Sequence, residues 1–419
     1  MKKITIIIPF LNEGDEPINT IDSIYQTANP EDFEILAIDD VSFDNIDFSR
    51  FNKYKDVKFV RNEIRLGVDG CRDIAINMVT TPYVIIIDAH MRFRNDNWLN
   101  KIVDELEKDP MLLLCTKSTG LNEENPNTWD INLIDDKDGD ANCGVDIYPY
   151  LILQDSPYEK NIFDARWKKR QLDKGYMYEV PCVMGANYAS SVNWLKHIRG
   201  FKGLLFWGAS EQFISMKTWL AGGSVKVLTT VLIGHLYRVK TSQGFTTELL
   251  YVLYNFLLMA YVLFDDIVSY NLLSYCLIDN RYKDSFKLLN ENILELENDR
   301  KYYKSIFIKD VVYLESKLNK FIINSDGIDN KITDYNIKQN LKKGIENDLV
   351  IKRRIINTYK KQLDNLQTLD IGDDRRLALI DNIVNRFPTL EKELTDKENE
   401  LAELTFSLEN DFKKYMLIK

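Results

Sequence analysis

The sequence of 419 residues has few cysteines, only three histidines and no excess of positive charge. Its five cysteines are scattered and form no Cys-x-x-Cys pair, which excludes a zinc ribbon or a disulfide framework and indicates a reducing, cytoplasmic setting. The net charge of -10 disfavours general attraction to nucleic-acid phosphates or to anionic membranes. The remaining composition, 45% hydrophobic and 28% charged, is that of a soluble globular protein with length for two or three domains.

The sequence also lacks an apolar run long enough for a membrane. The start, "MKKITIIIPFLNE", has lysines before an apolar run, but this run is shorter than a signal-peptide core and no small-residue cleavage site follows it. The longest later run, "LLYVLYNFLLMAYVLF" from Leu249, ends at Asp265 and is shorter than the ~20 residues that span a bilayer. We expect a core strand and a buried helix for these segments, and no membrane span.

Residues 1 to about 115 alternate short apolar segments with amphipathic ones. The apolar segments are "ITIIIPF", "FEILAIDD", "VKFVRN" and "YVIIID", and helical patterns such as "PINTIDSIYQTA" and "GCRDIAINMV" lie between them. Strands that are apolar on both faces and separated by helices are typical of a mostly parallel sheet covered on both sides. The sequence therefore predicts an α/β fold.

Two further regions differ from this pattern. Residues from about 120 to 175 are rich in Asn, Asp and Gly, which predicts an irregular surface insertion that could shape an acceptor cleft. Beyond Asp266 long charged segments with leucines at heptad-like spacing predict helices, as a coiled-coil seam or as amphipathic bundle helices. We expect a catalytic domain over 1–268 and an all-helical domain over 269–419.

Polar groups follow three of the predicted strands where they end: Asn12-Glu13, Asp39-Asp40 and Asp88-Ala89-His90. Residues i and i+2 of a strand point the same way, so Asp88 and His90 can reach one divalent cation together. A mixed oxygen and nitrogen set suits Mn²⁺ better than Ca²⁺. The alternative is that Asp88 caps the next turn and His90 is simply exposed.

The other two histidines have different contexts. His235, in "VLIGHLYR", ends another apolar strand and could complete the metal set, or could be a packed loop imidazole with a backbone partner. His197, in "VNWLKHIRGF", is expected on the surface of a helix.

Seven segments now form a pattern: "PFLNE", "EILAIDDVS", "RLGVDGCRDIA", "IIIDAH", "WGASEQ", "LAGG" and "GHLYR". In this order they resemble GT-A glycosyltransferases of family 2, and most closely the polypeptide N-acetylgalactosaminyltransferases, over residues 3–266. That family has a strand ending in Asp-x-His, then a Trp-Gly-Gly-Glu-Asn element and a Gly-His-Val-Phe-Arg element. The resemblance implies a GT-A, Rossmann-like fold and a UDP-sugar donor with Mn²⁺ or Mg²⁺ as cofactor.

The resemblance also implies roles for single residues. Asp88, His90 and His235 would bind the metal ion, while Asp39 or Asp40 would contact the uracil or ribose. Among the alternatives, one of the two aspartates caps the following turn, and we expect this of Asp40. Arg72 is placed near the donor by the same resemblance, and the alternative is a solvated helix charge.

Further roles fall in the later segments. Arg238 would clamp the diphosphate with its fork of donors. Trp207 would pack near the diphosphate or donor sugar, or else lie in the core, and Glu211 would hydrogen-bond the sugar or acceptor. Gly185 and Ala186, in "VMGAN", match a Gly-Gly beside the donor sugar, where a missing side chain makes room.

The sequence departs from the family in informative ways. Many inverting relatives have a general-base Asp where this chain has Gln212, whose amide cannot take a proton, so retention of anomeric configuration is favoured. Glu211 could still serve as base in an inverting enzyme. The second Gly of Trp-Gly-Gly is replaced by "AS", so the sugar need not carry over, and a helical region stands where the family has a lectin domain.

Three functions compete at this point. The leading hypothesis is a transferase acting on a protein, peptide or glycan acceptor, with the C-terminal helices docking the acceptor or forming a homodimer. A second is the same donor chemistry on a nucleic-acid base, which the acidic net charge disfavours. A third is a non-catalytic scaffold, which would not need the metal set.

Overall fold

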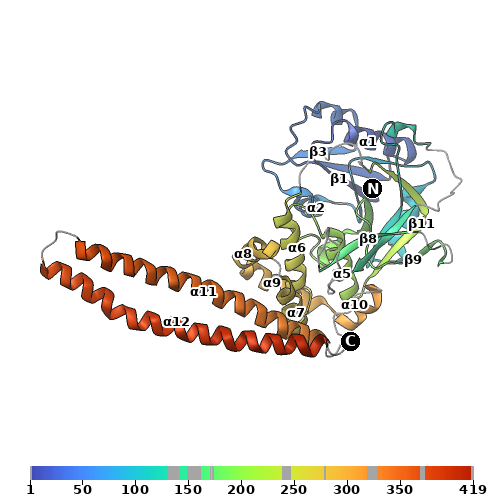
Figure 1. Cartoon of the computed structure of the whole chain (residues 1–419). Coiled ribbons are helices and arrows are strands. Elements are labelled where there is room, and N and C mark those ends of the chain that lie inside the picture. Colours follow the sequence, from blue (N-terminus) through green and yellow to red (C-terminus); the bar gives the residue numbers. More distant parts are fainter. Residues whose placement is uncertain are drawn as a thin grey trace. The chain divides into compact units, whose positions relative to one another are not determined.

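A computed structural model of the chain describes residues 2–130, 141–148, 162–169, 171, 174–237, 247–277, 280–318, 328–368 and 373–416. The chain divides into two compact units, one of Met1–Cys276 with Asn280–Asn324 and one of Leu277–Asp279 with Ser325–Lys419. The first unit contains the sheet and the second contains two long helices (Figure 1).

The first unit is built around one mixed sheet. Within the described residues its strands are β1 (Ile4–Phe10), β2 (Phe33–Asp39), β3 (Val57–Arg61), β4 (Tyr83–Ile87), β5 (Met91–Arg92), β6 (Leu112–Gly120), β7 (Asn142–Tyr148), β8 (Asp164–Lys169), β9 (Met177–Glu179), β10 (Asn187–Ser191) and β11 (Ser224–His235). Their order is β3-β2-β1-β4-β10-β6-β11-β5, with β7 and β8 extending from β6 and β9 pairing with β11. β3, β2, β1 and β4 run parallel, as do β6 and β11, whereas β10 is antiparallel to both of its neighbours. The predicted mostly parallel α/β sheet is confirmed.

The register of the parallel strands determines where their ends meet. Phe10 of β1 lies opposite Asp39 of β2, and Asp39 lies opposite Arg61 of β3. Every residue of β1 is buried, because helices cover both faces of the sheet. The polar residues that follow these strands are therefore brought to one edge of the sheet, where ligands bind in open α/β folds.

Helices pack on both faces of the sheet and create two cores (Figure 1). One core includes apolar side chains of α1 and α3, and the other includes those of α2, α4, α5 and the helices that follow α5. The helices of the first unit are α1 (Glu16–Thr27), α2 (Gly67–Met78), α3 (Trp98–Lys108), α4 (Val192–His197), α5 (Ser210–Leu220), α6 (Leu249–Val262), α7 (Asp266–Leu277), α8 (Lys283–Glu291), α9 (Ile293–Ile306) and α10 (Val311–Leu318).

The region expected to be an irregular insertion contains two strands. β7 pairs with β6 and with β8, both antiparallel. The expectation was wrong for these strands because Cys143, Val145 and Ile147 are buried at every second position, a strand period that the surrounding Asn, Asp and Gly residues obscure. Residues 131–140 and 149–161 lie outside the described residues.

The long apolar run forms α6, which is a buried helix as predicted: all residues from Leu253 to Ala260 are buried. Among the described helices, none is both long and apolar enough for a bilayer crossing. The five cysteines are all free and buried, and His197 lies exposed at the end of α4, as predicted.

The first compact unit continues past residue 268, the end expected for the catalytic domain. Leu296 and Tyr303 of α9 and Leu314 of α10 are buried in the core that contains α5 and α6. The backbone N–H groups of Ile308 and Lys309 both donate to the carbonyl of Leu220 at the end of α5. The separate role assigned to residues 269–419 stays a prediction.

The second unit is a pair of helices, α11 (Ile328–Thr368) and α12 (Asp373–Met416), that run side by side in opposite directions (Figure 1). Arg353 and Glu398 form an ion pair of 2.7 Å between them, and Lys352 pairs with Glu393. The leucine-rich segment predicted to be helical lies within α12. Four of its leucines, Leu390, Leu394, Leu401 and Leu404, are half-buried, as in the apolar stripe of an amphipathic helix.

Candidate active site

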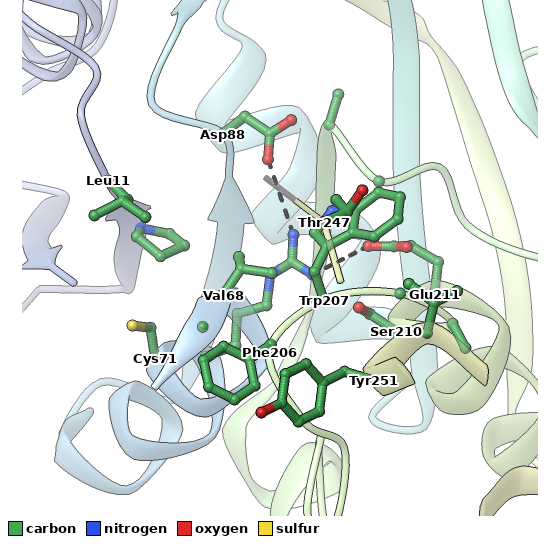
Figure 2. A pocket seen from close by; sticks show the side chains of 18 of the residues that line it. Leu11, Val68, Cys71, Asp88, Phe206, Trp207, Ser210, Glu211, Thr247 and Tyr251 are labelled. Atoms are coloured by element: carbon green, nitrogen blue, oxygen red, sulfur yellow. Dashed lines mark hydrogen bonds and ion pairs between the residues drawn. The ribbon is translucent and has the colours of Figure 1, made fainter. Parts of the chain in front are cut away.

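A cavity of about 820 Å³ opens at the edge of the sheet where β1 and β4 end (Figure 2). Its walls combine residues that are far apart in the chain, which the parallel strand order brings together. The lining residues come from 9–13 at the end of β1, 40 after β2, 65–72 at the start of α2, 88–90 after β4, 145 on β7, 165–167 on β8, 182–186 before β10, 206–212 before and within α5, 235–237 at and after the end of β11, and 247–256 before and within α6.

The three predicted metal ligands lie together in this cavity. One ligand atom from each of Asp88, His90 and His235 lies within 4.8 Å of the other two. His235 Nε2 is 3.1 Å from Asp88 Oδ2, and the two imidazole rings are 4.9 Å apart. The sheet explains this meeting, because β11 pairs with β5 so that His235 lies opposite Met91, next to His90.

The protonation of this cluster suits a divalent cation. Burial lowers the pKa of His235, although Asp88 opposes the shift, so the imidazole is neutral near pH 7 and can donate a lone pair. Burial alone would raise the pKa of Asp88, but the hydrogen bond with His235 and the nearby His90 and Arg72 hold it below its ordinary value. An ionised carboxylate together with imidazole nitrogens fits Mn²⁺, and three protein ligands leave positions for a diphosphate.

His90 has a second partner that sets its orientation. Its Nδ1 lies 3.1 Å from Glu13 Oε2, in the segment after β1. A carboxylate on one ring nitrogen of a histidine fixes the tautomer and leaves the other nitrogen for a metal. Glu13 therefore orients one of the three candidate metal ligands. The sequence placed Glu13 at the edge of the sheet but assigned no role to it.

Arg72 is buried, so the alternative of a solvated helix charge is wrong. Its guanidinium lies 3.2 Å from Glu211 Oε1 and 3.8 Å from Asp88 Oδ1, the two pairs drawn as dashed lines in Figure 2. Burial lowers the pKa of Arg72, but Tyr188, Glu211, and two aspartates outweigh this effect and raise it. Arg72 therefore remains a fixed positive charge between the metal cluster and Glu211.

Glu211 lies next to Gly185, the glycine predicted beside the donor sugar. A Cβ on Gly185 would lie 3.3 Å from the Glu211 carboxylate, so a larger residue would push against this side chain. Burial raises the pKa of Glu211, while Arg72 opposes the shift. Ala186 accepts a backbone hydrogen bond from Asp88 at 3.1 Å, which ties the predicted sugar pocket to the metal cluster.

Trp207 is 46% exposed and lines the cavity, which excludes the alternative of a core residue. Its segment has left-handed backbone at Phe206, Gly208 and Ala209, with φ of 53°, 110° and 65°. Such a strained turn needs support from its surroundings. Asn255 of α6 provides it, since its side chain donates to the carbonyls of Leu205 and Gly208, both at 2.9 Å.

The two aspartates after β2 have different partners. Asp40 lines the cavity and accepts hydrogen bonds from the backbone N–H groups of Leu66 and Gly67, both at 2.8 Å, so it holds the start of α2. Asp39 Oδ1 accepts from the backbone N–H of Ser42 at 3.0 Å. The turn after β2 is thus capped by Asp39, whereas we expected Asp40 there. The physical reason is that Asp39 ends β2 within reach of the Ser42 N–H, whereas both oxygens of Asp40 accept hydrogen bonds from the start of α2.

Three further residues bear on the site. Gln212 is buried, and its amide donates to the carbonyl of Phe163 at 3.3 Å. Trp167 on β8 is 48% exposed, lines the cavity and meets Tyr237 edge to face at 5.9 Å. Arg238, the predicted diphosphate clamp, lies outside the described residues.

Asp69 and Ser210 were missed by sequence reasoning. Asp69 has no exposed surface, and its Oδ1 accepts from Ser210 Oγ at 2.5 Å and faces Arg72 at 3.4 Å. Burial raises the pKa of Asp69 to about 7, although Arg72 and Ser210 oppose the shift. The available signal was weak: an Asp in the first turn of a helix is normally an exposed cap.

The class of protein now follows. Residues 5–179 match the model of the family described as glycosyl transferase family 2. The strand order and the structural likeness given below show a GT-A-like fold, and the matched segment is similar to glycosyl transferase family 2.

The particular relatives are N-acetylgalactosaminyltransferases. Polypeptide N-acetylgalactosaminyltransferase 10 of Homo sapiens is 26% identical over 252 residues, which cover 56% of this chain and 38% of that protein. Probable N-acetylgalactosaminyltransferase 7 of Caenorhabditis elegans is 23% identical over 250 residues, 58% of this chain and 40% of that protein. A crystal structure of GalNAc-T7 with UDP, GalNAc and Mn2+ superposes with a TM-score of 0.59 at 20% identity, covering 76% of this chain and 57% of that one. The structural likeness confirms the fold, and the chain spans less than half the length of these curated relatives.

Proposed function

We propose that the chain is a metal-dependent glycosyltransferase that moves a sugar from a UDP-sugar to an acceptor nucleophile. The observation that carries the proposal is the meeting of Asp88, His90 and His235 in one cavity, within 4.8 Å. The names of the relatives support it, and so does the crystal structure of GalNAc-T7, which was determined with UDP, GalNAc and Mn2+.

The proposal assigns the charged residues to the diphosphate side. Bound Mn²⁺ or Mg²⁺ would neutralise charge on the departing diphosphate. Arg72 adds a fixed positive charge near Asp88, in a buried position where charge is less screened. Arg238 follows His235 by three residues and keeps its predicted role as diphosphate clamp.

The sugar side of the cavity would be formed by Glu211, Gly185 and Trp207. An ionised carboxylate only accepts hydrogen bonds, so Glu211 would bind sugar hydroxyls while Arg72 holds its other oxygen in place. Gly185 leaves space next to that carboxylate. Trp207 presents a half-exposed ring at the cavity mouth, a surface suited to a sugar face.

We further propose that the reaction retains anomeric configuration. A general base for inversion would have to be Gln212, which cannot take a proton, or Glu211, which is paired with Arg72. The anomeric form of the product, read by NMR coupling, decides between retention and the inverting alternative. An inverted product would assign the base to Glu211.

The acceptor is proposed to be a protein, peptide or glycan. Trp167 and Tyr237 form an aromatic corner at the cavity, and such rings bind apolar side chains and sugar faces alike. The pair of long C-terminal helices is proposed to dock the acceptor or to form a homodimer, since 44 residues of α12 are not needed for the donor cavity.

The test uses the full chain with Mn²⁺ and a panel of nucleotide sugars, with release of UDP as readout. We expect metal-dependent release with at least one UDP-sugar, and loss of release in Asp88→Ala and His235→Ala. His197→Ala is the matched control, because His197 is exposed and is not among the residues that line the cavity. No release with any donor, or equal activity in His235→Ala, would overturn the proposal.

A further inference from the structure

A buried carboxylate lies beneath the cavity, behind the residues that face the donor. Asp69, in the first turn of α2, has no exposed surface and is bonded to Ser210, the first residue of α5, over 2.5 Å. The two residues are 141 positions apart in the chain, so the bond joins the start of one helix to the start of another.

The same two helix starts are also in backbone contact. The N–H of Asp69 donates to the carbonyl of Phe206 at 3.2 Å, and Gly67 forms an isolated parallel bridge with Phe206. A Cβ on Gly67 would lie 2.1 Å from Phe206 Cα, so only glycine permits this approach. The segment from Phe206 to Ser210 is therefore attached to α2 at both of its ends, by the backbone contacts of Phe206 and by the hydrogen bond of Ser210. Trp207 lies between these two attachments.

The contact determines where Arg72 lies. Asp69 Oδ1 faces the Arg72 guanidinium at 3.4 Å, and the same guanidinium reaches Glu211 at 3.2 Å and Asp88 at 3.8 Å. Rings of Tyr188 and Phe201 lie 5.6 Å from its central carbon. One cation therefore has carboxylates in three directions, and Figure 2 shows Ser210 next to Glu211 on the α5 side of this arrangement.

The packing of the two helix starts does not by itself require an Asp at position 69 and a Ser at position 210. A neutral residue at position 69 would avoid burying a charge, and Asp69 Oδ2 has no hydrogen-bond partner in the described part of the chain. A costly buried group that the fold could do without indicates a functional constraint. Ser210 also stands where "AS" departs from the Trp-Gly-Gly element of the resemblance.

We infer that Asp69 and Ser210 are positioning residues, which lock the 206–210 segment to α2 and hold Arg72 between Asp88 and Glu211. The part of the inference that concerns transfer rests on the proposed function. The lock itself is a property of the ligand-free protein and can be tested without any donor.

The first experiment is hydrogen exchange with mass spectrometry on the ligand-free full chain. Ser210→Ala removes the hydroxyl, and we expect exchange of peptides covering 206–213 to rise about tenfold or more. Ser210→Thr keeps the hydroxyl and should restore most of the protection. Ser224→Ala is the matched control, since it removes a serine–aspartate bond of the same kind, Ser224 Oγ to Asp109 Oδ2 at 2.7 Å, away from the cavity.

The second experiment measures transfer. We expect kcat to fall about tenfold in Ser210→Ala and in Asp69→Ala, with KM for the donor and Mn²⁺ affinity changed less than about threefold, because the Ser210 hydroxyl is bonded to Asp69 and Asp69 does not line the cavity. If the residues act through one bond, the double variant should lose roughly 10- to 30-fold, not the roughly 100-fold of independent effects. A KM change without a kcat change would contradict a positioning role.

The outcomes separate the two claims. Wild-type exchange in both Ser210→Ala and Asp69→Ala overturns the lock, whatever the kinetics show. Raised exchange in these variants, combined with no turnover by the wild type on any donor, supports the lock and overturns the proposed function. Should Ser210→Ala fail to fold, Asp69→Ala and Ser210→Thr carry the same comparison, because Ala removes the acceptor of the hydrogen bond and Thr keeps its donor.

Discussion

Replacing Asp69 by Asn should stabilise the protein above pH 7 and leave it unchanged near pH 4. Burial raises the pKa of this carboxyl from 3.8 to about 7. The folded state then holds a proton that the unfolded state releases, so stability is fully present below pH 3.8 and is lost as pH rises through 7. A pKa difference of one corresponds to 1.36 kcal/mol, so the loss between pH 4 and pH 8 is roughly 4 kcal/mol. Asn keeps the shape and cannot ionise, which removes this loss.

The assay is urea unfolding at pH 4, 6 and 8, followed by tryptophan fluorescence. All six tryptophans lie between Trp98 and Trp219, so the signal reports the first compact unit alone. The stability difference between Asp69→Asn and wild type should grow by roughly 2–4 kcal/mol from pH 4 to pH 8. The control is Asp47→Asn. Hydrogen bonds from Ser49 lower the pKa of the exposed Asp47, so its pH dependence has the opposite direction. Parallel curves for Asp69→Asn and wild type would refute the reasoning.

Further expectations follow from the same contacts. Arg72→Met leaves Asp69, Asp88 and Glu211 without their shared cation and should lower the free energy of unfolding in urea by about 3–5 kcal/mol. Its control, Lys53→Met, breaks an exposed pair with Asp22 and should lower it by about 0–1 kcal/mol. Trp98→Ala, at a side chain only 1% exposed, should cost about 3–5 kcal/mol, while Trp207→Ala, at 46% exposed, should cost less than about 2 kcal/mol and mainly raise KM. A chain ending at residue 324 should keep the tryptophan unfolding transition, and a chain ending at 268 should lose it or aggregate, because α9 and α10 fill the core beside α5. Equal stability of the two truncations, by thermal denaturation, would contradict this packing.

The sequence predicted the features that depend on local pattern and chain order. Strand ends with polar residues mark a sheet edge, which made Asp88, His90 and His235 candidates, and the resemblance to GT-A glycosyltransferases implied that they bind a metal together. The buried α6 was likewise evident from its composition. Local pattern could not reveal that Arg72 is buried, because polar and apolar residues mix around it in α2 as they do in a helix on the surface. Its partners, Asp88 after β4 and Glu211 in α5, are far away in the sequence.

What the sequence could not show depends on contacts between distant segments. The bond from Ser210 to Asp69 exists only because Gly67 lets the chain at Phe206 approach α2. β7 and β8 were hidden because a strand period of a few residues was surrounded by turn-forming residues. In each case the sequence pattern did not show which distant segment of the chain would pack against the residue.

Charge around the metal cluster leads to a last expectation, about the order of binding. The Arg72 guanidinium lies between two carboxylates of the cavity, Asp88 and Glu211, so this group of three carries a net negative charge when both acids are ionised. A diphosphate entering such a site meets repulsion unless a divalent cation is already present. We expect UDP to bind at least about 100-fold more weakly in EDTA than with Mn²⁺ by calorimetry, a loss of about 2.7 kcal/mol. Asp88→Ala should bind UDP weakly under both conditions, because it removes a ligand of the cation along with one of the charges. Equal UDP affinity with and without metal would mean that Arg72 suffices to receive the diphosphate, and that the cluster of Asp88, His90 and His235 serves the fold instead.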